Sequence, residues 1–319
     1  MKILGIGSAL PKKVVSNDDL AEYMDTSDEW IRERTGIVNR HIAVDETTTS
    51  LSVEAVKRAL AAAKVSGEEI DLIIAATVSS DYIYPTLSCE VQAAIGAKNA
   101  TAFDIGAGCS GFLFALGTAD GYFRTGRYKK AVILGAETLS KMMDWTDRST
   151  CVLFGDGAGA AVLSAEGEQL KAMTQGSNGF EGMVLKCNNR PVNNLFRPLG
   201  PQTYSFTEMN GQAVYKFAVR TVPNAITKVL EEAHMSVDEV KLFVLHQANK
   251  RIIEAVAKRL GQSMDKFPTN MEKCGNISAA SVPTLLDQLL EEGRIQTGDK
   301  IVLAGFGAGL TWGACALEW

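Results

Sequence analysis

Apolar and polar positions follow the same succession twice along this chain. The segment from Ala55, "AVKRALAAAKVSGEEIDLIIAA", places apolar residues at helical spacing, then a polar turn, then an unbroken apolar run. The segment from Ala225, "AITKVLEEAHMSVDEVKLFVLH", repeats this order without a gap. Helical spacing predicts an amphipathic helix, and a short unbroken apolar run predicts a strand that is covered on both faces. The two segments are offset by 170 residues, since 225 − 55 = 170.

A second pair of segments keeps the same offset. "RYKKAVILGAE" from Arg127 corresponds to "TGDKIVLAGFG" from Thr297, and both contain an apolar strand. Two matches at one offset indicate an internal duplication. The sequence therefore predicts two similar halves, residues 1–170 and 171–319, each reading strand, helix, strand, helix, strand, strand. This order is typical of an α/β fold in which helices pack on mixed sheets.

The composition narrows the classes of protein that fit. With 46% hydrophobic residues over 319 positions, the chain can bury a large core. No apolar run is long enough to span a membrane, and the start "MKILGIGSALPKK" does not fit a secretion signal, so we expect a cytoplasmic protein without a membrane partner. The net charge of -5 gives no reason to expect a nucleic-acid partner. The six cysteines lack paired spacing, which indicates reduced thiols and no metal site.

One cysteine occupies a turn where chemistry is expected. In "DIGAGCSGFLFAL", Cys109 lies between the end of a predicted strand and the start of a predicted helix. The unpaired N–H groups at a helix start favour a thiolate, so this position is expected to lower the pKa of the thiol. A small buried core cysteine fits the same position equally well. A shift of 170 residues leads to Ala279, so only one half carries the thiol.

Two polar residues in the second half are candidates to act with this thiol. His246 follows the predicted strand "VKLFVL" and precedes a helix, where α/β proteins form ligand crevices. A purely structural histidine fits there as well, as it does for His41 and His234. Asn276 lies in "CGNISAAS" at the position equivalent to Gly106, where a turn or cap role remains an alternative.

These residues and their surroundings resemble the β-ketoacyl-acyl carrier protein synthase III family from end to end. The resemblance rests on "DTSDEWIRERTGI", "DIGAGCSGF", "DWTDRSTCVLFGDGAGA", "LHQANKRII", "CGNISAAS" and "GFGAGLTWGA", in that order. It implies the thiolase-like α/β fold, in which two similar halves form a five-layered α-β-α-β-α sandwich. This agrees with the duplication inferred from the pattern alone.

The resemblance implies a decarboxylative condensation that initiates type II fatty acid biosynthesis. A short acyl-CoA primer and malonyl-acyl carrier protein would give 3-ketoacyl-acyl carrier protein, with Cys109 carrying the acyl group. His246 and Asn276 would polarise the malonyl thioester. The oxyanion hole would use the backbone N–H groups of Cys109 and Ala308. Because alanine replaces a glycine of the family there, a positive φ at Ala308 would be strained.

The resemblance also implies where the substrates bind. Coenzyme A would contact Trp30 and Arg148 through its adenine, Arg34 through a phosphate and Asn249 through its pantetheine arm. Trp30 as a surface anchor and Arg148 in an ion pair with Asp147 or Asp156 are the alternatives. Acyl-CoA is a substrate, so no cofactor and no metal are implied.

Two further roles concern protein partners. Tyr84 matches a position that closes the acyl pocket across a homodimer interface. Acyl carrier protein, an acidic partner, would meet a basic patch, and a solvated helix face is the alternative. The residues of this patch are Lys216, Arg251, Lys258 and Arg259.

Related enzymes fit less well, with one exception. A degradative thiolase needs a second cysteine in the C-terminal glycine turn, and "GFGAGLTW" has none. An elongating synthase uses two histidines, and none follows His246. A subunit that only binds acyl carrier protein would lack the nucleophile. A starter enzyme of secondary metabolism shares the three residues, so the sequence leaves the pathway and the preferred primer open.

Overall fold

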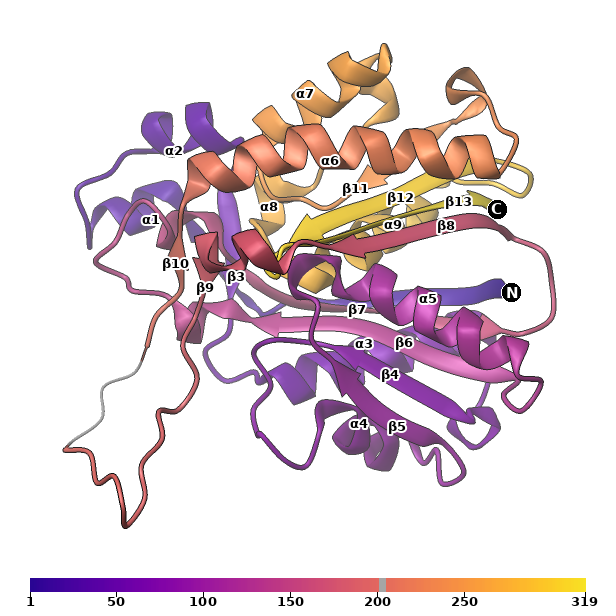
Figure 1. The fold of residues 1–319 in the computed structure, drawn as a ribbon, viewed down its shortest axis with the longest axis horizontal. Helices are drawn as coiled ribbons and strands as arrows, with labels where there is room; N and C mark the ends of the chain where they lie inside the picture. The colour runs from indigo at the N-terminus through magenta and orange to yellow at the C-terminus, as the bar shows by residue number, and fades with distance from the viewer. Residues whose placement is uncertain (201–204) are drawn as a thin grey trace.

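The computed structural model, which describes residues 1–200 and 205–319, has two stacked sheets with helices between and outside them (Figure 1). The middle layer consists of α5 (Gly111–Arg124) and α9 (Ser281–Glu291), because each contacts strands of both sheets. The outer layers consist of α3 (Thr48–Ala63) and α4 (Leu87–Ile95) on one side and α6 (Gly211–Glu232) and α7 (Lys250–Leu260) on the other. The predicted five-layered α-β-α-β-α sandwich is confirmed.

Within the described residues, the first sheet has five strands in the order β1-β7-β6-β4-β5. They are β1 (Lys2–Ala9), β4 (Leu72–Ala76), β5 (Thr101–Ile105), β6 (Lys130–Thr138) and β7 (Asp156–Ser164). β4 runs parallel to β5 and β6, whereas β7 runs antiparallel to β1 and β6. Both faces of the sheet are covered, so β4 is apolar and buried along its whole length.

The second sheet has four strands in the described part of the chain, in the order β11-β12-β13-β8. They are β8 (Leu170–Ser177), β11 (Leu242–Leu245), β12 (Lys300–Gly307) and β13 (Thr311–Glu318). β11 and β12 are parallel, and the other two pairs are antiparallel. This sheet repeats the mixed pattern of the first with one edge strand fewer.

Shorter elements surround the sandwich. They are β2 (Lys13–Ser16), α1 (Asn17–Ala21), α2 (Asp28–Thr35), β3 (Asn39–Ile42), β9 (Leu185–Lys186), β10 (Glu208–Met209) and α8 (Met271–Cys274). One of them, α2, carries Trp30 and Arg34. Residues 187–200, which follow β9, extend away from the sandwich (Figure 1). None of the described helices has the length and apolar character that a membrane span requires.

The 170-residue repeat is visible in the backbone. The 3₁₀ turn Gly67–Glu69 corresponds to Val237–Glu239, and each follows a serine that forms a capping box. The 3₁₀ turn Gly108–Ser110 corresponds to Ser278–Ala280, and each leads directly into a helix of the middle layer.

The predicted order of elements within each half was incomplete. A third helix, α5 or α9, precedes the last two strands of each half, because the segment after the 3₁₀ turn is long and apolar enough to pack between the sheets. The halves also differ at one edge. β5 would correspond to residues 271–275, where α8 lies instead, which is why the second sheet is narrower.

Candidate active site

A cavity of about 550 Å³ brings the three predicted catalytic side chains together from distant parts of the chain. Cys109 comes from the turn between β5 and α5, His246 from the end of β11, and Asn276 from the turn after α8. The cavity therefore lies where the two halves meet. Its lining also includes Trp30, Arg34, Tyr215, Asn249, Arg251, Phe306 and Gly307.

Cys109 is held as a thiol rather than a thiolate. The residue keeps partial access to the cavity, but burial of the sulfur raises its pKa to about 11, and the charge of Glu137 adds to this rise. The Ser278 hydroxyl and the N–H groups of Cys109 and Ala308 act in the opposite direction. The expectation that the helix start lowers this pKa was wrong, because burial by residues remote in sequence outweighs the local N–H groups.

Ala308 avoids the strain that a positive φ would bring, because the positive φ in this turn falls on Gly309. The two turns approach closely, because a Cβ on Gly307 would lie 2.5 Å from the Cys109 nitrogen. A Cβ on Gly108, whose φ is +50°, would lie 2.9 Å from the Ala308 nitrogen. The backbone N–H groups of Cys109 and Ala308 thus lie near one sulfur atom.

His246 is neutral at physiological pH. Its ring is buried, which lowers its pKa to about 3. The backbone N–H of His246 donates to the Ala304 carbonyl at 2.8 Å. The imidazole ring packs edge-on against the Phe306 ring, with 5.4 Å between the two ring centres. Nδ1 is buried without a hydrogen-bond partner among the described residues, which leaves Nε2 as the nitrogen available to a ligand in the cavity.

The side chain of Asn276 has a fixed orientation. Its Oδ1 accepts from the Ser278 backbone N–H at 2.9 Å, so its amide N–H groups are the ones that can donate into the cavity. The Asn276 backbone is held on both sides, since its N–H donates to the Leu153 carbonyl and its carbonyl accepts from the Gly155 N–H. An amide in this setting is a preorganised neutral donor.

The predicted coenzyme A residues gather at the mouth of the cavity. The guanidinium carbons of Arg34 and Arg148 lie 4.6 and 5.2 Å from the centre of the Trp30 ring. Arg148 also binds Asp25, through its backbone carbonyl and its carboxylate. A purine between Trp30 and Arg148 would therefore have to displace the arginine from the indole.

Asn249 is the N-cap of α7 and already has partners. Its Oδ1 accepts from the Arg251 N–H at 2.9 Å, and its Nδ2 donates to the Arg34 carbonyl at 3.0 Å. These bonds join α7 to α2 at the cavity mouth. The amide holds this rim together, and its face still lines the cavity.

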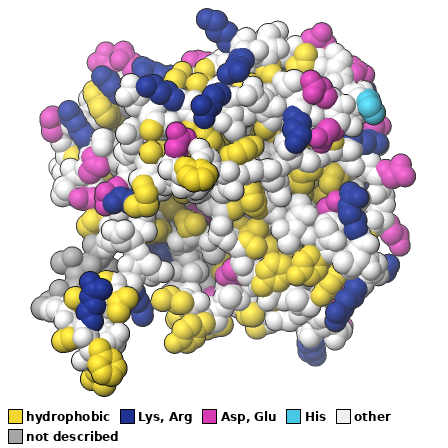
Figure 2. Space-filling view, viewed as in Figure 1, with side chains coloured by type: hydrophobic (Ala, Val, Ile, Leu, Met, Phe, Trp, Pro, Cys, Tyr) yellow, Lys and Arg dark blue, Asp and Glu magenta, His cyan; other side chains and the backbone are white. Residues whose placement is uncertain are grey.

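The predicted basic residues do not all face the same way. Arg251 lines the cavity and donates to the Glu33 carbonyl, whereas Arg259 donates to Val219 and Asn224 of α6. Lys216 and Lys258 are exposed. Figure 2 shows Lys and Arg side chains gathered along the upper edge of the molecule, where α7 lies.

Tyr84 does not reach Cys109 within one chain. It is 84% exposed and lines a different cavity, together with Tyr82, Ile83 and residues 187–190. The predicted acyl-pocket role thus has no support from a single copy of the chain.

Two residues of the site were missed by the sequence analysis. Glu137 is fully buried near Cys109, and Ser278, with φ of +48°, touches both Asn276 and Glu137. The available signal was a carboxylate at the end of the otherwise apolar strand "AVILGAE". Across residues 1–200 and 205–319, no group of three or more metal-ligating side chains is found.

The fold and the cavity together define a thiolase-fold condensing acyltransferase. Two models of the 3-oxoacyl-[acyl-carrier-protein] synthase III family match the chain, one over residues 103–179 and its C-terminal part over residues 230–319. The beta-ketoacyl-[acyl-carrier-protein] synthase III of Clostridium acetobutylicum is 46% identical, over 100% of this chain and 98% of that protein. The chain belongs to the β-ketoacyl-acyl carrier protein synthase III family.

Solved structures give the same result. The 3-oxoacyl-[acyl-carrier-protein] synthase III of Aquifex aeolicus superimposes with a TM-score of 0.93 and 43% identity, covering 100% of this chain and 99% of that chain. The priming beta-ketosynthase of the R1128 polyketide pathway has a TM-score of 0.92 and 35% identity, covering 99% and 95%.

Proposed function

We propose that this protein condenses a short acyl-CoA primer with malonyl-acyl carrier protein and so initiates fatty acid synthesis. The observation that carries the proposal is the convergence of a thiol, a neutral imidazole and an oriented amide in one cavity between the halves. The family and its printed names agree with this reaction. The chemistry needs no cofactor, because each step uses a side chain or backbone N–H described above.

In the first half-reaction Cys109 takes the acyl group. Because the pKa of the thiol is about 11, its proton must leave as the sulfur attacks the thioester carbonyl. A His246 ring with a pKa of about 3 is too weak a base to hold this proton, so the proton passes to the departing coenzyme A sulfur. The N–H groups of Cys109 and Ala308 stabilise the tetrahedral oxyanion. Its collapse expels coenzyme A, which takes up the proton, and leaves a thioester on Cys109.

In the second half-reaction the malonyl group loses carbon dioxide. The electrons of the broken C–C bond form an enolate, whose oxygen is stabilised by His246 and by the Asn276 amide. The enolate carbon then attacks the acyl thioester on Cys109. The C–S bond breaks, the released Cys109 thiolate takes up a proton from solvent, and 3-ketoacyl-acyl carrier protein is the product.

We assign the cavity mouth to the two carriers. Trp30, Arg34 and Arg148 form a stacked cationic and aromatic surface that suits a nucleotide with phosphates. Arg251 at the mouth, with the exposed Lys216 and Lys258, forms the acyl carrier protein contact. The Arg259 side chain is bound to Val219 and Asn224 of α6, so it contributes to this contact only through its charge.

We further propose that a second copy of the chain completes the acyl pocket through Tyr84. Tyr82, Ile83 and Tyr84 are all more than half exposed beside a cavity that they share with residues 187–190. Leu195 and Phe196, farther along the projecting segment, are 94% and 98% exposed. Apolar exposure on this scale is typical of a surface that another protein covers.

The test is a coupled assay with purified protein, acyl-CoA and malonyl-acyl carrier protein. We expect 3-ketoacyl-acyl carrier protein, detected by its mass, with acetyl-, isobutyryl- or another short primer. A panel from acetyl- to decanoyl-CoA identifies the primer. Transfer of the acyl group to the carrier without release of carbon dioxide would contradict the proposal.

A further inference from the structure

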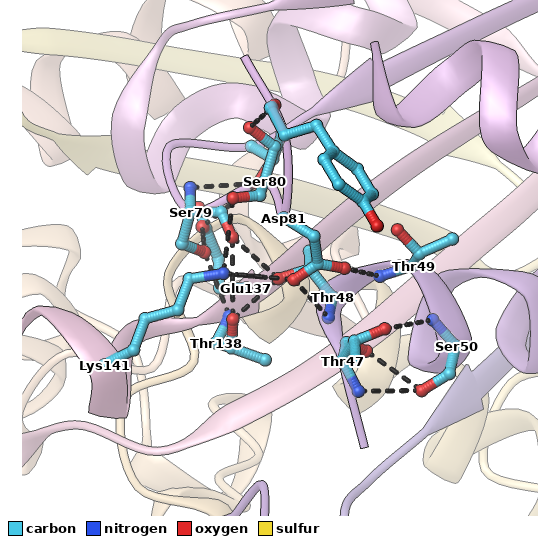
Figure 3. Close-up of polar contacts among 12 residues, drawn as sticks. Thr47, Thr48, Thr49, Ser50, Ser79, Ser80, Asp81, Glu137, Thr138 and Lys141 are labelled. Atoms are coloured by element: carbon cyan, nitrogen blue, oxygen red, sulfur yellow. Dashed lines mark hydrogen bonds and ion pairs between the residues drawn. The ribbon is translucent and has the colours of Figure 1, made fainter. Parts of the chain in front are cut away.

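Glu137, at the end of β6, belongs to a polar network that also contains Ser79, Thr138 and Lys141 (Figure 3). Glu137 is fully buried and is not part of the lining of the substrate cavity. It joins the two halves, because its carboxyl group meets the loop after β4 on one side and Ser278 on the other. The half-reactions described above do not use it.

The two carboxyl oxygens of Glu137 have different surroundings. Oε2 accepts from the Ser79 hydroxyl at 2.5 Å, the Val78 N–H at 3.1 Å and the Thr77 hydroxyl at 3.3 Å. Oε1 meets only the Ser278 hydroxyl, at 3.1 Å, among the described residues. Three donors saturate Oε2 as an acceptor, so a proton on this carboxyl group resides on Oε1 and points at Ser278.

Ser278 lies between Glu137 and the nucleophile. Its hydroxyl is close enough to the Cys109 sulfur to lower the pKa of the thiol. A hydroxyl group has one proton to donate, so it donates either to Glu137 or to Cys109. Its backbone N–H is already committed to Asn276, which fixes the residue in place.

We propose that Glu137 is a positioning residue whose protonation state sets the direction in which the Ser278 hydroxyl donates. Protonated Glu137 donates through Oε1 to the Ser278 oxygen, and the Ser278 proton then turns to the Cys109 sulfur. Ionised Glu137 accepts that proton instead, and Cys109 loses a donor while it faces a negative charge. The carboxyl group thus tunes the nucleophile without touching substrate.

Other charged groups around Glu137 are paired or turned away. Lys141 binds Asp81 at 3.2 Å and donates to the Ser80 carbonyl and the Thr48 hydroxyl, each at 3.3 Å, rather than to Glu137 itself. Asp156 on β7 accepts from Ser140 and Ala43 rather than from residues near Ser278. Cys109 is the titratable group whose pKa is raised by the charge of Glu137.

The titration of Glu137 falls in the working range of pH. Burial raises its pKa to about 7, against the donors on Oε2 that lower it. Below pH 7 the protonated form directs Ser278 to Cys109. Above pH 7 ionised Glu137 raises the pKa of Cys109 further, so the gain in thiolate with rising pH is smaller than for an isolated thiol.

The variant Glu137→Gln tests this directly. The three donors hold the amide oxygen at the Oε2 position, so the amide N–H group donates to Ser278 as protonated Glu137 does. The experiment measures iodoacetamide alkylation of the Cys109 peptide by mass spectrometry from pH 6 to 9. We expect equal rates at pH 6 and a rate about tenfold higher for Glu137→Gln at pH 9, equivalent to roughly one pKa unit.

Matched variants separate the hydroxyl from other effects. In a Ser278→Ala background, the gain from Glu137→Gln at pH 9 should fall to the smaller part that the charge of Glu137 contributes directly, and Asp156→Asn should leave the parent profile unchanged. Cys89 and Cys187, which are partly exposed, serve as references in each sample. Coincident profiles, a uniform change at all pH values, or a gain of undiminished size without the Ser278 hydroxyl would contradict the proposal.

This inference deepens the proposed function and rests on Cys109 as its nucleophile, but the two can fail separately. Alkylation requires no acyl-CoA and no acyl carrier protein. Failure of acyl transfer to Cys109 would overturn the proposed function, whereas coincident alkylation profiles would overturn only the role of Glu137.

Discussion

The turn at residues 106–111 and its counterpart at residues 276–281 have the same backbone and different chemistry. Both form a 3₁₀ turn that leads into a helix of the middle layer. The first carries Cys109 where the second has Ala279, and the second carries Asn276 where the first has Gly106. Duplication supplied two equivalent positions at one interface, and each half holds the group that the other lacks.

The strands that end beside these turns show the same complementarity. Gly307 on β12 must be glycine, because a Cβ there would lie 2.5 Å from the Cys109 nitrogen. Its counterpart on β6 is Glu137, whose carboxyl group fills the space toward Ser278. In the second half, the glycine at this position leaves space for Cys109. In the first half, Glu137 at the equivalent position holds Ser278, which lies beside Cys109.

The largest expected effect comes from moving the thiol between the two turns. Cys109→Ala should lower condensation at least 10³-fold, since loss of a nucleophile removes the covalent route. Adding Ala279→Cys should restore nothing, because Ala279 is buried and packs against Gly111 and Gly135. Turnover with acetyl-CoA and malonyl-acyl carrier protein is the measurement. Recovered turnover in the double variant would contradict the claim that only the first turn can hold the nucleophile.

Asn276 and Gly106 give the next test. Asn276→Ala should lower malonyl decarboxylation about 10²- to 10³-fold, the usual cost of one oxyanion donor, and keep acyl transfer to Cys109. Gly106→Ala is the matched control, because a Cβ there would meet no atom within 4 Å. Decarboxylation and single-turnover acylation are measured separately. Equal loss of both half-reactions in Asn276→Ala would contradict the assigned role.

His246→Ala should behave like Asn276→Ala. A ring with a pKa of about 3 cannot hold the proton of the Cys109 thiol, so this variant should keep acyl transfer to Cys109 and lose malonyl decarboxylation. The same two assays measure this, and loss of acylation would contradict a donor role for His246.

The buried carboxyl group of Glu137 should make the free energy of unfolding depend on pH. Its counterpart in the second half, Gly307, has no titratable side chain and adds no such dependence. The pKa of Glu137 is about 7 in the folded chain and 4.5 in the unfolded one, so unfolding releases a proton at intermediate pH. The contribution of Glu137 to the free energy of unfolding is fully present below pH 4.5 and is lost as pH rises through 7. The loss is roughly 3 kcal/mol at most.

Glu137→Gln should remove this component of the pH dependence. Denaturant unfolding of the parent and the variant from pH 5 to 8.5 measures it. A difference between the two unfolding free energies that stays constant over this range would show that Glu137 does not titrate there.

The smallest effect concerns the loop in which Tyr84 lies. Its counterpart, Glu254, lies on α7, so only the first half projects apolar side chains here. Tyr84→Ala should extend the range of primers, because each buried methylene contributes about 0.8 kcal/mol and two or three exceed one tenfold step. Values of kcat/KM from acetyl- to decanoyl-CoA test this. An unchanged chain-length profile would remove Tyr84 from the pocket.

The sequence predicted the features that depend on local pattern. The 170-residue offset located the two sheets and both turns, because strands and helices repeat their periodicity in each half. It did not predict that α8 replaces the edge strand β5. Residues 271–274 form a helix there, and an edge position tolerates this without breaking the sheet.

The site was predicted by residue type but not by electrostatics. Cys109, His246 and Asn276 meet as expected, yet the pKa of Cys109 is raised by burial among residues remote in sequence. The pKa of Glu137 is likewise raised by burial that local sequence does not reveal, since its partner Ser278 is 141 positions away. The sequence left open whether Ala308 has a positive φ, and in the structure the positive φ of this turn lies at Gly309.

The central claim is that the turn of the first half carries the acyl group. The most direct measurement is a peptide map of the protein after single-turnover reaction with a radiolabelled short acyl-CoA, before and after addition of malonyl-acyl carrier protein. We expect label on the Cys109 peptide, and we expect this label to leave as 3-ketoacyl-acyl carrier protein on the addition. Label on Cys151 or Cys274, or label on Cys109 that malonyl-acyl carrier protein does not remove, would contradict the claim.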